Sequence, residues 1–211
     1  MKKGKGRFVP ALSLFWCASQ QASTVFTAVF IDGAYLEKVL QHEHSRARVD
    51  FRLLVDAMVG DDVLLRTYYY NCRPYQSNPP TEDERARYSS WRRFEDALRN
   101  IPNFDVRLGK LVLRGTDSDG KRIFQQKGVD LMLGVDMALL AAKNRLAKVV
   151  LLSGDSDFVP AIEAVKREGI LTTLWHGRDR RDSSASRELR QTCDQRQVLT
   201  REIVQSSLLR L

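Results

Sequence analysis

Short apolar runs alternate with segments of helical periodicity along most of the chain. The apolar runs are rich in β-branched and aromatic residues, as is typical of buried strands: Val25–Ile31, Val63–Tyr70, Lys148–Leu152 and Ile170–Trp175. The helical patterns between and after them cover Gly33–His44, Phe51–Met58, Thr81–Leu98 and Phe158–Arg167. Strands that alternate with helices predict an α/β fold of three layers, in which helices cover both faces of a mainly parallel sheet.

Three other segments complete the predicted elements. Asp105–Arg114 and Lys121–Gln125 are extended on either side of a Ser-Asp-Gly turn, which favours a hairpin. Val129–Leu146 has the pattern of a helix that is apolar on nearly every side, and we expect such a helix to be buried. Residues 184–211 have a helical pattern with a mixed surface.

The two ends of the chain are expected to lie outside the main domain. Cations within residues 2–7 precede the apolar stretch Phe8–Ala18, which resembles a secretory signal but leads to no convincing cleavage site. We predict a leader over residues 1–24, a domain over 25–195 and a helical C-terminal extension over 196–211. No other run approaches the roughly 20 apolar residues that a membrane span requires, so no membrane partner is expected.

The composition indicates a polyanionic partner. Lys and Arg number 34 against 26 Asp and Glu, giving a formal charge of +8. Such an excess suits a substrate that is held through phosphate contacts, although it could also serve only solubility. Cys17, Cys72 and Cys193 are too far apart in sequence for a cysteine zinc site or a disulfide framework, so we expect reduced thiols and a cytoplasmic location.

Aspartates stand where two of the predicted strands end. Asp32 follows the run that closes at Ile31, and Asp155 follows the run that closes at Leu152. The carboxyl ends of parallel strands meet at one edge of the sheet, where α/β folds hold their ligands. Together with Asp130, at the start of the apolar helix, they predict an acidic pocket. Several carboxylates held close together suit a hard cation, Mg²⁺ or Mn²⁺.

Two neighbouring aspartates have less certain roles. Asp157 could be a further ligand or could cap the helix that follows it, and it could do both. Asp136 lies six positions after Asp130, about 240° around a helix, so a straight helix cannot aim both at one ion. Asp136 is therefore either a supporting neighbour of the site or a member of a buried ion pair.

The predicted metal site needs no side-chain nucleophile. A metal held by carboxylates can activate water for phosphodiester hydrolysis, and no serine, cysteine or histidine nucleophile motif is recognisable. A haloacid dehalogenase-type phosphatase would place a second aspartate at position 34, where Ala34 stands. Neither a phosphate-binding Gly-rich loop ending in Lys-Ser or Lys-Thr nor a Gly-x-Gly-x-x-Gly fingerprint occurs.

Four motifs, in this order and spacing, give the chain a family resemblance. They are Phe30-Ile31-Asp32-Gly33, Lys127-Gly128-Val129-Asp130, Val135-Asp136-Met137 and Leu152-Ser153-Gly154-Asp155-Ser156-Asp157-Phe158-Val159-Pro160. Over roughly Val25 to Asp194 the chain resembles the NYN domain family, in its LabA-like branch, which is related to the PIN-domain nucleases.

The resemblance implies a PIN-like fold, a pocket that binds Mg²⁺ or Mn²⁺, and RNA cleavage as in the active members. The catalytic acids that it implies are Asp32, Asp130, Asp155 and Asp157, of which the first three hold the metal. The same motifs place four residues around the site without a fixed role: Asp136, Ser153, Lys127 and Tyr35. Many relatives have Asn where Tyr35 stands.

The leading hypothesis is a metal-dependent ribonuclease that cuts internally. Phosphate would be neutralised by Lys127 and by Arg92 and Arg93 on the helix after Thr81, although these arginines also fit a solvated helix face. The alternative is a module with little turnover that captures RNA or protein as a regulator. Hydrolysis of small phosphate esters is a third hypothesis. A homo-oligomer remains open.

Overall fold

The computed structural model describes residues 26–120, 122–143, 145–178 and 183–209, so the predicted leader over residues 1–24 lies outside the described part. The strands are β1 (Phe26–Asp32), β2 (Val63–Cys72), β3 (Phe104–Thr116), β4 (Arg122–Lys127), β5 (Leu146–Leu152), β6 (Leu171–His176) and β7 (Gln195–Val198). The α-helices are α1 (Gly33–Glu43), α2 (Phe51–Val59), α3 (Glu82–Arg99), α4 (Val129–Ala141), α5 (Val159–Arg167), α6 (Arg187–Thr192) and α7 (Arg201–Ser206), and a 3₁₀ turn, η1, covers Ser156–Phe158.

The strands form one sheet in the order β4-β3-β2-β1-β5-β6-β7. Every neighbouring pair in it is parallel except β3 and β4, which form the predicted antiparallel hairpin. The prediction of a mainly parallel α/β sheet is therefore confirmed. None of the helices in the described ranges is long and apolar enough to cross a bilayer.

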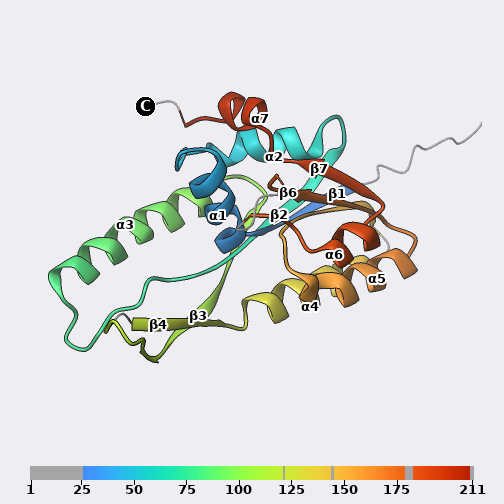
Figure 1. Cartoon of the computed structure of the whole chain (residues 1–211). Helices are drawn as coiled ribbons and strands as arrows, with labels where there is room; N and C mark the ends of the chain where they lie inside the picture. Colours follow the sequence, from blue (N-terminus) through green and yellow to red (C-terminus); the bar gives the residue numbers. More distant parts are fainter. Residues whose placement is uncertain (1–25, 121, 144, 179–182, 210–211) are drawn as a thin grey trace, which may run out of the picture.

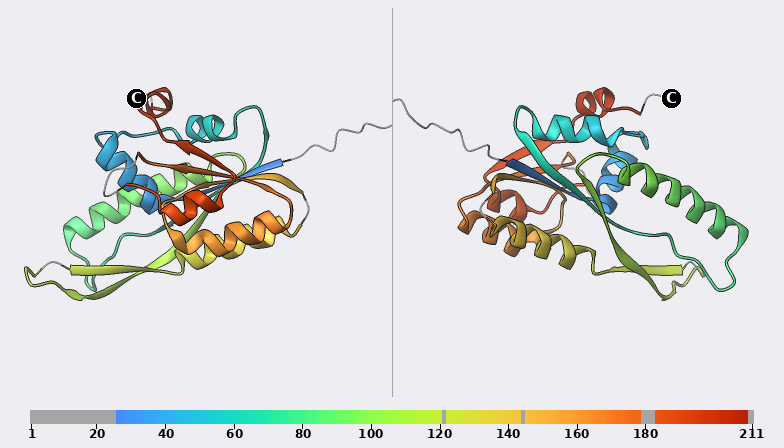
Figure 2. Two further views of the ribbon diagram at one scale, coloured as in Figure 1. Left: turned by 45° about the vertical axis from the view of Figure 1, so that its right-hand side comes forward. Right: turned by 180° about the vertical axis from the view of Figure 1, so that it is seen from behind.

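Helices cover both faces of the sheet, so the molecule has three layers (Figures 1 and 2). Side chains alternate along β1: Val29 and Ile31 pack in one core with α1, α2, α3 and α7, and Ala28 and Phe30 pack in the other with α4, α5 and α6. Because the central strands are buried on both faces, they read as continuous apolar runs in the sequence.

Helix α4 is shorter and more exposed than its sequence predicts. It ends at Ala141, and Leu146, expected in the helix, begins β5 and pairs with Phe26 of β1. Pairing with the central strand thus overrides the helical pattern. Expected to be buried on nearly every side, the helix instead exposes Leu131 and Leu139.

The expectation of a helical C-terminal segment was wrong in part. Residues 195–198 form β7, which pairs in parallel with β6 and extends the sheet, before the short helix α7. The segment is an edge strand, and its exposed residues gave no apolar run by which to recognise it. The predicted boundary between the main domain and the C-terminal extension, after residue 195, therefore falls inside β7. The division of the chain into domains stays a prediction.

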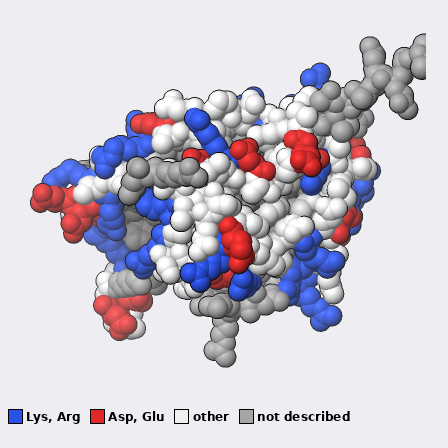
Figure 3. All heavy atoms as spheres, turned by 90° about the horizontal axis from the view of Figure 1, so that it is seen from above, with Lys and Arg blue, Asp and Glu red and all other residues white. Residues whose placement is uncertain are grey.

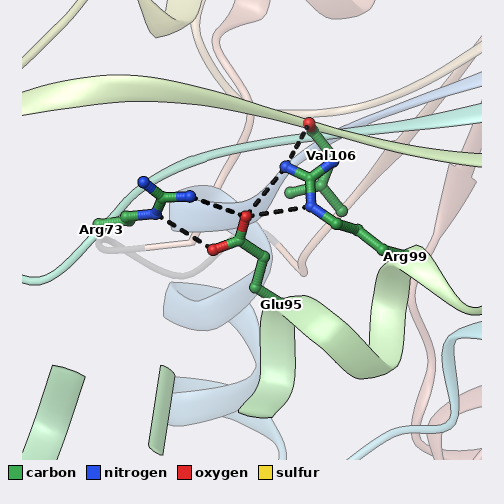
Figure 4. A network of polar contacts seen from close by, with 4 residues as sticks. All are labelled: Arg73, Glu95, Arg99 and Val106. Carbon is green, nitrogen blue, oxygen red and sulfur yellow. Dashed lines mark hydrogen bonds and ion pairs between the residues drawn. The ribbon is translucent and has the colours of Figure 1, made fainter. Parts of the chain in front are cut away.

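A buried carboxylate fixes α3 to the neighbouring sheet. Glu95 accepts hydrogen bonds from Arg73, which follows β2, and from Arg99 one turn further along α3, as Figure 4 shows. Arg99 also donates to the Val106 carbonyl oxygen of β3 at 3.3 Å. A buried charge needs such partners, and here two guanidinium groups and a strand carbonyl link the helix to two strands.

Candidate functional site

The candidate site lies where the direction of the strand order reverses. From β1 the chain continues to β2 on one side, and β5 returns to pair with β1 on the other side. Asp32 ends β1, and Ser153 follows Leu152 at the end of β5, beside Ile31. In open α/β sheets such a switch point leaves a crevice at the carboxyl ends of the strands. The fold therefore opens a crevice next to Asp32.

Asp32 is buried at this edge and its carboxylate is held on both oxygens. The backbone N–H of Tyr35 donates to Oδ1 at 3.0 Å, and the hydroxyl of Ser153 donates to Oδ2 at 3.0 Å. Asp32 is also the N-cap of α1. Burial nevertheless raises its pKa, and the negative charge of Asp130 adds to the rise, while the hydrogen bonds oppose it.

Asp130 approaches the same edge of the sheet as Asp32, but from the helices on the other face of the sheet. It stands in the first turn of α4, which begins after Gly128, a residue in the left-handed conformation with φ of 82°. Partial desolvation raises the pKa of Asp130, and the charges of Asp155 and Asp157 raise it further. The carboxylates at this edge therefore repel one another.

The loop after β5 orients Asp155. Its Oδ1 accepts a hydrogen bond from the backbone N–H of Asp157 at 3.0 Å, so Asp155 is the N-cap of η1. The Ser153 hydroxyl accepts from the Asp155 backbone N–H at 3.4 Å. Asp157 lies inside η1, and α5, which starts at Val159, has no side-chain cap. Of the roles left open for Asp157, the capping of the next helix is therefore not seen: Asp155 caps η1, and α5 begins without a side-chain cap.

Three of the expected ligands line one cavity of about 400 Å³. Its walls are formed by Asp32, Ala34, Tyr35, Lys38, Gln126, Asp130, Gly154, Asp155, Ser156, Ser184 and Ser186. Asp157 lines a neighbouring groove between α4 and α5 instead. The structure thus brings Asp32, Asp130 and Asp155 together from three separate segments of the chain.

The donor set of this cavity fits a hard divalent cation. Three carboxylates and three serine hydroxyls line the cavity and can supply oxygen atoms, and the repulsion among the carboxylates is the kind that a bound cation relieves. Within the described part of the chain, no three His, Cys, Asp or Glu side chains are already grouped closely enough to hold a metal ion. The side chains would therefore have to draw together around an ion.

Asp136 stays outside the cavity. Its Oδ2 accepts a hydrogen bond from the Tyr70 hydroxyl at 2.9 Å and lies 3.6 Å from Nε of Arg107. Of the two roles left open by the sequence, the geometry matches the ion-pair member. The six-residue spacing from Asp130 turns the two side chains to different sides of α4.

The expected phosphate-binding cations also stand apart from the cavity wall. Arg92 and Arg93 are exposed on α3, and Arg93 donates to the Ser89 hydroxyl one turn earlier. Lys127 ends β4, next to Gln126, which does line the cavity. Their roles toward a substrate remain predictions.

Five polar residues of the wall had no site role in the sequence analysis, and one of them, Ser156, lies within the motif that follows β5. Lys38 lies three positions after Tyr35 on α1, so the helical spacing from Tyr35 could have indicated it. Gln126 comes from the hairpin, and Ser184 and Ser186 precede α6. Nothing local in the sequence marks these three, because only the folded chain brings them to the switch point.

Tyr35 joins three segments around the cavity. A Cβ atom on Gly154 would lie 2.3 Å from Cε2 of Tyr35, so the ring packs directly on the loop after β5. The Tyr35 hydroxyl donates to the Ser183 carbonyl oxygen at 2.7 Å and accepts from the Gly177 N–H at 3.1 Å. Burial raises the pKa of Tyr35 to about 12, so the hydroxyl remains a donor at neutral pH.

Comparison with known proteins gives results that agree with this geometry. The NYN domain family model matches residues 26–200. The low amplitude and bright protein LabA of Synechococcus elongatus is 32% identical over 103 residues, a match that spans 49% of this chain and 52% of LabA. The chain thus matches only about half the length of that relative.

A solved structure shares the fold. The crystal structure of a protein of unknown function from Vibrio parahaemolyticus superimposes with a TM-score of 0.63, over 90% of this chain and all of the other, at 19% identity. At that identity the likeness concerns the fold alone. Because the family model covers well over half of the 211 residues, the chain belongs to the NYN domain family, and its similarity to LabA places it in the LabA-like branch.

Proposed function

We propose that the chain is a metal-dependent ribonuclease that hydrolyses internal phosphodiester bonds of RNA. The observation that carries the proposal is the convergence of Asp32, Asp130 and Asp155 on one cavity at the switch point. Membership of the NYN family, which is related to the PIN-domain nucleases, supports ribonuclease activity in general. A location in the cytoplasm also belongs to the proposal, since Cys72 and Cys193 are free thiols.

Each acid has a distinct part in the proposed site. Asp32, Asp130 and Asp155 would hold Mg²⁺ or Mn²⁺, with Asp32 kept in place by its hydrogen bonds from Ser153 and Tyr35. Asp157 lies beside Asp155 and adds negative charge at Asp130. When bound, the ion would activate water and stabilise the charge that develops on the scissile phosphate and its leaving oxygen.

Cations near the cavity would hold the RNA backbone. Lys38 lines the cavity on α1, and Lys127 flanks it at the end of β4. In Figure 3, Lys and Arg side chains gather at the left, at the end of the molecule formed by α3 and the hairpin, with acidic side chains among them. Arg92 and Arg93 belong to α3 and would contact phosphates away from the reacting bond.

A second function is a regulatory module that binds RNA or protein with little turnover. Two observations favour it. Tyr35 replaces a polar Asn of many relatives by a side chain committed to Ser183 and Gly177, and no set of three ligands in the described ranges is already grouped for a metal. This candidate predicts capture of RNA without cleavage products.

The test is incubation of the purified protein with labelled RNA in Mg²⁺, Mn²⁺ or EDTA. Circular RNA identifies internal cutting, and DNA of the same sequence tests the substrate class. We expect cleavage that requires the metal and falls at least 100-fold in Asp32→Asn and Asp155→Asn, since ligands that act through one ion are each needed.

Asp136→Asn is the matched control, because it makes the same change on α4 outside the cavity. It should retain activity. Cleavage that persists in EDTA and in the cavity variants would contradict the proposal. Binding of RNA without any products in either metal would support the regulatory module instead.

A further inference from the structure

Helix α4 carries an apolar ridge on the surface of the molecule. Leu131, Val135 and Leu139 are 72%, 45% and 60% exposed, which makes this the most exposed apolar line on the helix. Residues four positions apart lie one above another on a helix, so the three side chains form a continuous ridge. Leu133 and Met137, on the opposite side, are fully buried. A helix that is apolar on both sides is normally covered on both sides.

A groove whose lining includes several Gly and Ala residues runs beside the ridge, between α4 and α5. It encloses about 740 Å³, and its floor includes Gly134, Ala138, Ala161 and Ala164. A Cβ atom on Gly134 would lie only 3.6 Å from Cβ of Ala161, so the two helices approach closely there. Figures 1 and 2 show α4 and α5 side by side on the outer side of the molecule, away from α2 and α7. A ridge next to a groove is a surface that can fit a copy of itself.

The charges along this surface are polarised. Asp130, Asp157 and Glu188 line one end of the groove, near the N-terminus of α4. Lys143 and Arg145 are exposed just beyond the other end of the helix. The helix dipole has the reverse polarity, so it offsets part of the side-chain charge at each end, while the two dipoles of an antiparallel pair are themselves aligned favourably.

We propose that this surface joins two copies of the chain, with their α4 helices packed antiparallel about a twofold axis near Val135. In this arrangement the ridge of each copy enters the groove of the other, Leu131 of one copy lies beside Leu139 of its partner, and the two copies of Val135 meet at the axis. A twofold contact uses the same patch on both copies, which a ridge beside its own groove provides.

Charge complementarity fixes the direction of the pairing and selects a second copy as the occupant. In the antiparallel arrangement the acidic end around Asp157 and Glu188 faces the basic end around Lys143 of the partner copy. A parallel pairing would bring the acidic ends together. Asp130 lines both the groove and the acidic cavity, so the partner's basic end would lie close to the cavity mouth.

Cysteine cross-linking tests the geometry directly. Val135→Cys should form a disulfide-linked dimer under mild oxidation, because the two side chains meet at the axis. Leu131→Cys and Leu139→Cys should each link poorly alone but link to each other when the two proteins are mixed. Val63→Cys is the matched control, since Val63 is a valine of similar exposure, 49%, at the start of β2. All variants carry Cys17→Ser, and Cys72 and Cys193 are buried, so the native thiols provide little background.

The oligomeric state of the full chain tests the association without any added thiol. We expect a dimer by sedimentation, weakened roughly 100-fold or more in Val135→Glu, because that change places two like charges at the centre of an apolar contact. Val63→Glu should remain dimeric. Circular dichroism checks that both variants are folded.

Three outcomes would overturn the proposal. They are a monomer at all concentrations, a dimer that Val135→Glu does not affect, and a monomer that becomes a dimer only when residues 1–25 are removed, which would make that segment the occupant. None of these measurements depends on RNA cleavage, so a failure here is distinguishable from a failure of the proposed ribonuclease activity.

Discussion

The hydroxyl of Ser153 donates a hydrogen bond to Oδ2 of Asp32 at 3.0 Å and so joins the ends of β5 and β1 across the switch point. This contact holds the buried carboxylate in one orientation, and it stabilises the charged form of an acid whose pKa burial raises. The hydrogen bond joins two residues that are 121 positions apart in the chain. The geometry of the site therefore depends in part on a residue that would not itself carry the ion.

Substitution of Ser153 should weaken metal binding. Ser153→Ala removes the donor to Asp32, so the pKa of Asp32 should rise further and its orientation should be lost. Partners that orient ligands typically contribute 10- to 100-fold to metal affinity, and we expect a loss of about that size for Mn²⁺ by calorimetry. Ser156→Ala is the control, because it removes a serine hydroxyl of the cavity wall and leaves the hydrogen bond from Ser153 to Asp32 in place. Equal Mn²⁺ affinity in Ser153→Ala and wild type would contradict this role.

Substitution of Tyr35 should loosen the cavity wall. Tyr35→Phe leaves the Gly177 N–H and the Ser183 carbonyl oxygen without their buried partner. Each unsatisfied buried group costs about 1–3 kcal/mol, so the free energy of unfolding in urea should fall by about that amount or more. Tyr68→Phe is the matched control, because no hydrogen bond of that hydroxyl is seen in the described part of the chain. Similar unfolding midpoints for the two variants would show that the Tyr35 links contribute little.

Stability and metal binding should respond to pH in opposite directions. The folded-state pKa values of Asp32 and Asp130 are raised, so between the ordinary value of 3.8 and the raised values the folded protein binds more protons than the unfolded chain. The free energy of unfolding without metal should therefore contain a contribution that is lost as the pH rises through the folded pKa values. Metal affinity should rise over the same range, because the ion needs the charged carboxylates.

Asp130→Asn provides the check on this pH dependence. Denaturation curves at several pH values, with and without Mg²⁺, should show a smaller pH-dependent loss of stability in the variant. The variant should also gain less stability from Mg²⁺ than wild type, since binding to the folded state alone stabilises by mass action. A variant with the wild-type pH profile and the wild-type gain from Mg²⁺ would show that Asp130 is neither a source of the pH dependence nor a metal ligand.

Acid should weaken the attachment of the hairpin through Glu84. This carboxylate accepts hydrogen bonds from the backbone N–H groups of Ser77 and Thr81, each at 3.0 Å, and from Arg122 of β4 at 2.6 Å. These bonds, above all those from Ser77, lower the pKa of Glu84 from 4.5 to about 2. Above pH 4.5 the stabilisation is complete, and it is lost as the pH falls toward 2, since the unfolded chain takes up the proton first.

Glu84→Gln should flatten this part of the stability curve. The difference between the free energies of unfolding at pH 6 and pH 3 should be smaller in the variant than in wild type. Glu82→Gln, two residues earlier in the same helix, should leave the difference unchanged. A Glu84→Gln curve parallel to that of wild type would show that the carboxylate is not held as the structure indicates.

The sequence by itself determined the layers of the fold and the edge at which the acids meet. Strands buried on both faces must be continuously apolar, so β1 and β5 were recognisable without their neighbours as the runs Val25–Ile31 and Lys148–Leu152, although the first two residues of β5 were missed. Chain direction alone then places Asp32 and Asp155 at the carboxyl ends of those strands. The capping box of Thr81 with Glu84 is also a local signal, which confirms the predicted start of α3.

Contacts between distant segments decided the rest. The apolar pattern after Val129 continues past Ala141, but the helix ends there and Leu146 pairs with Phe26, because tertiary contacts in the sheet override the local helical pattern. The strand β7 has no apolar signal of its own, because its exposed residues belong to the edge of the sheet. A pattern of apolar residues shows which side chains avoid water, but only the tertiary structure shows what covers them. For the ridge on α4, nothing in the described part of the chain does.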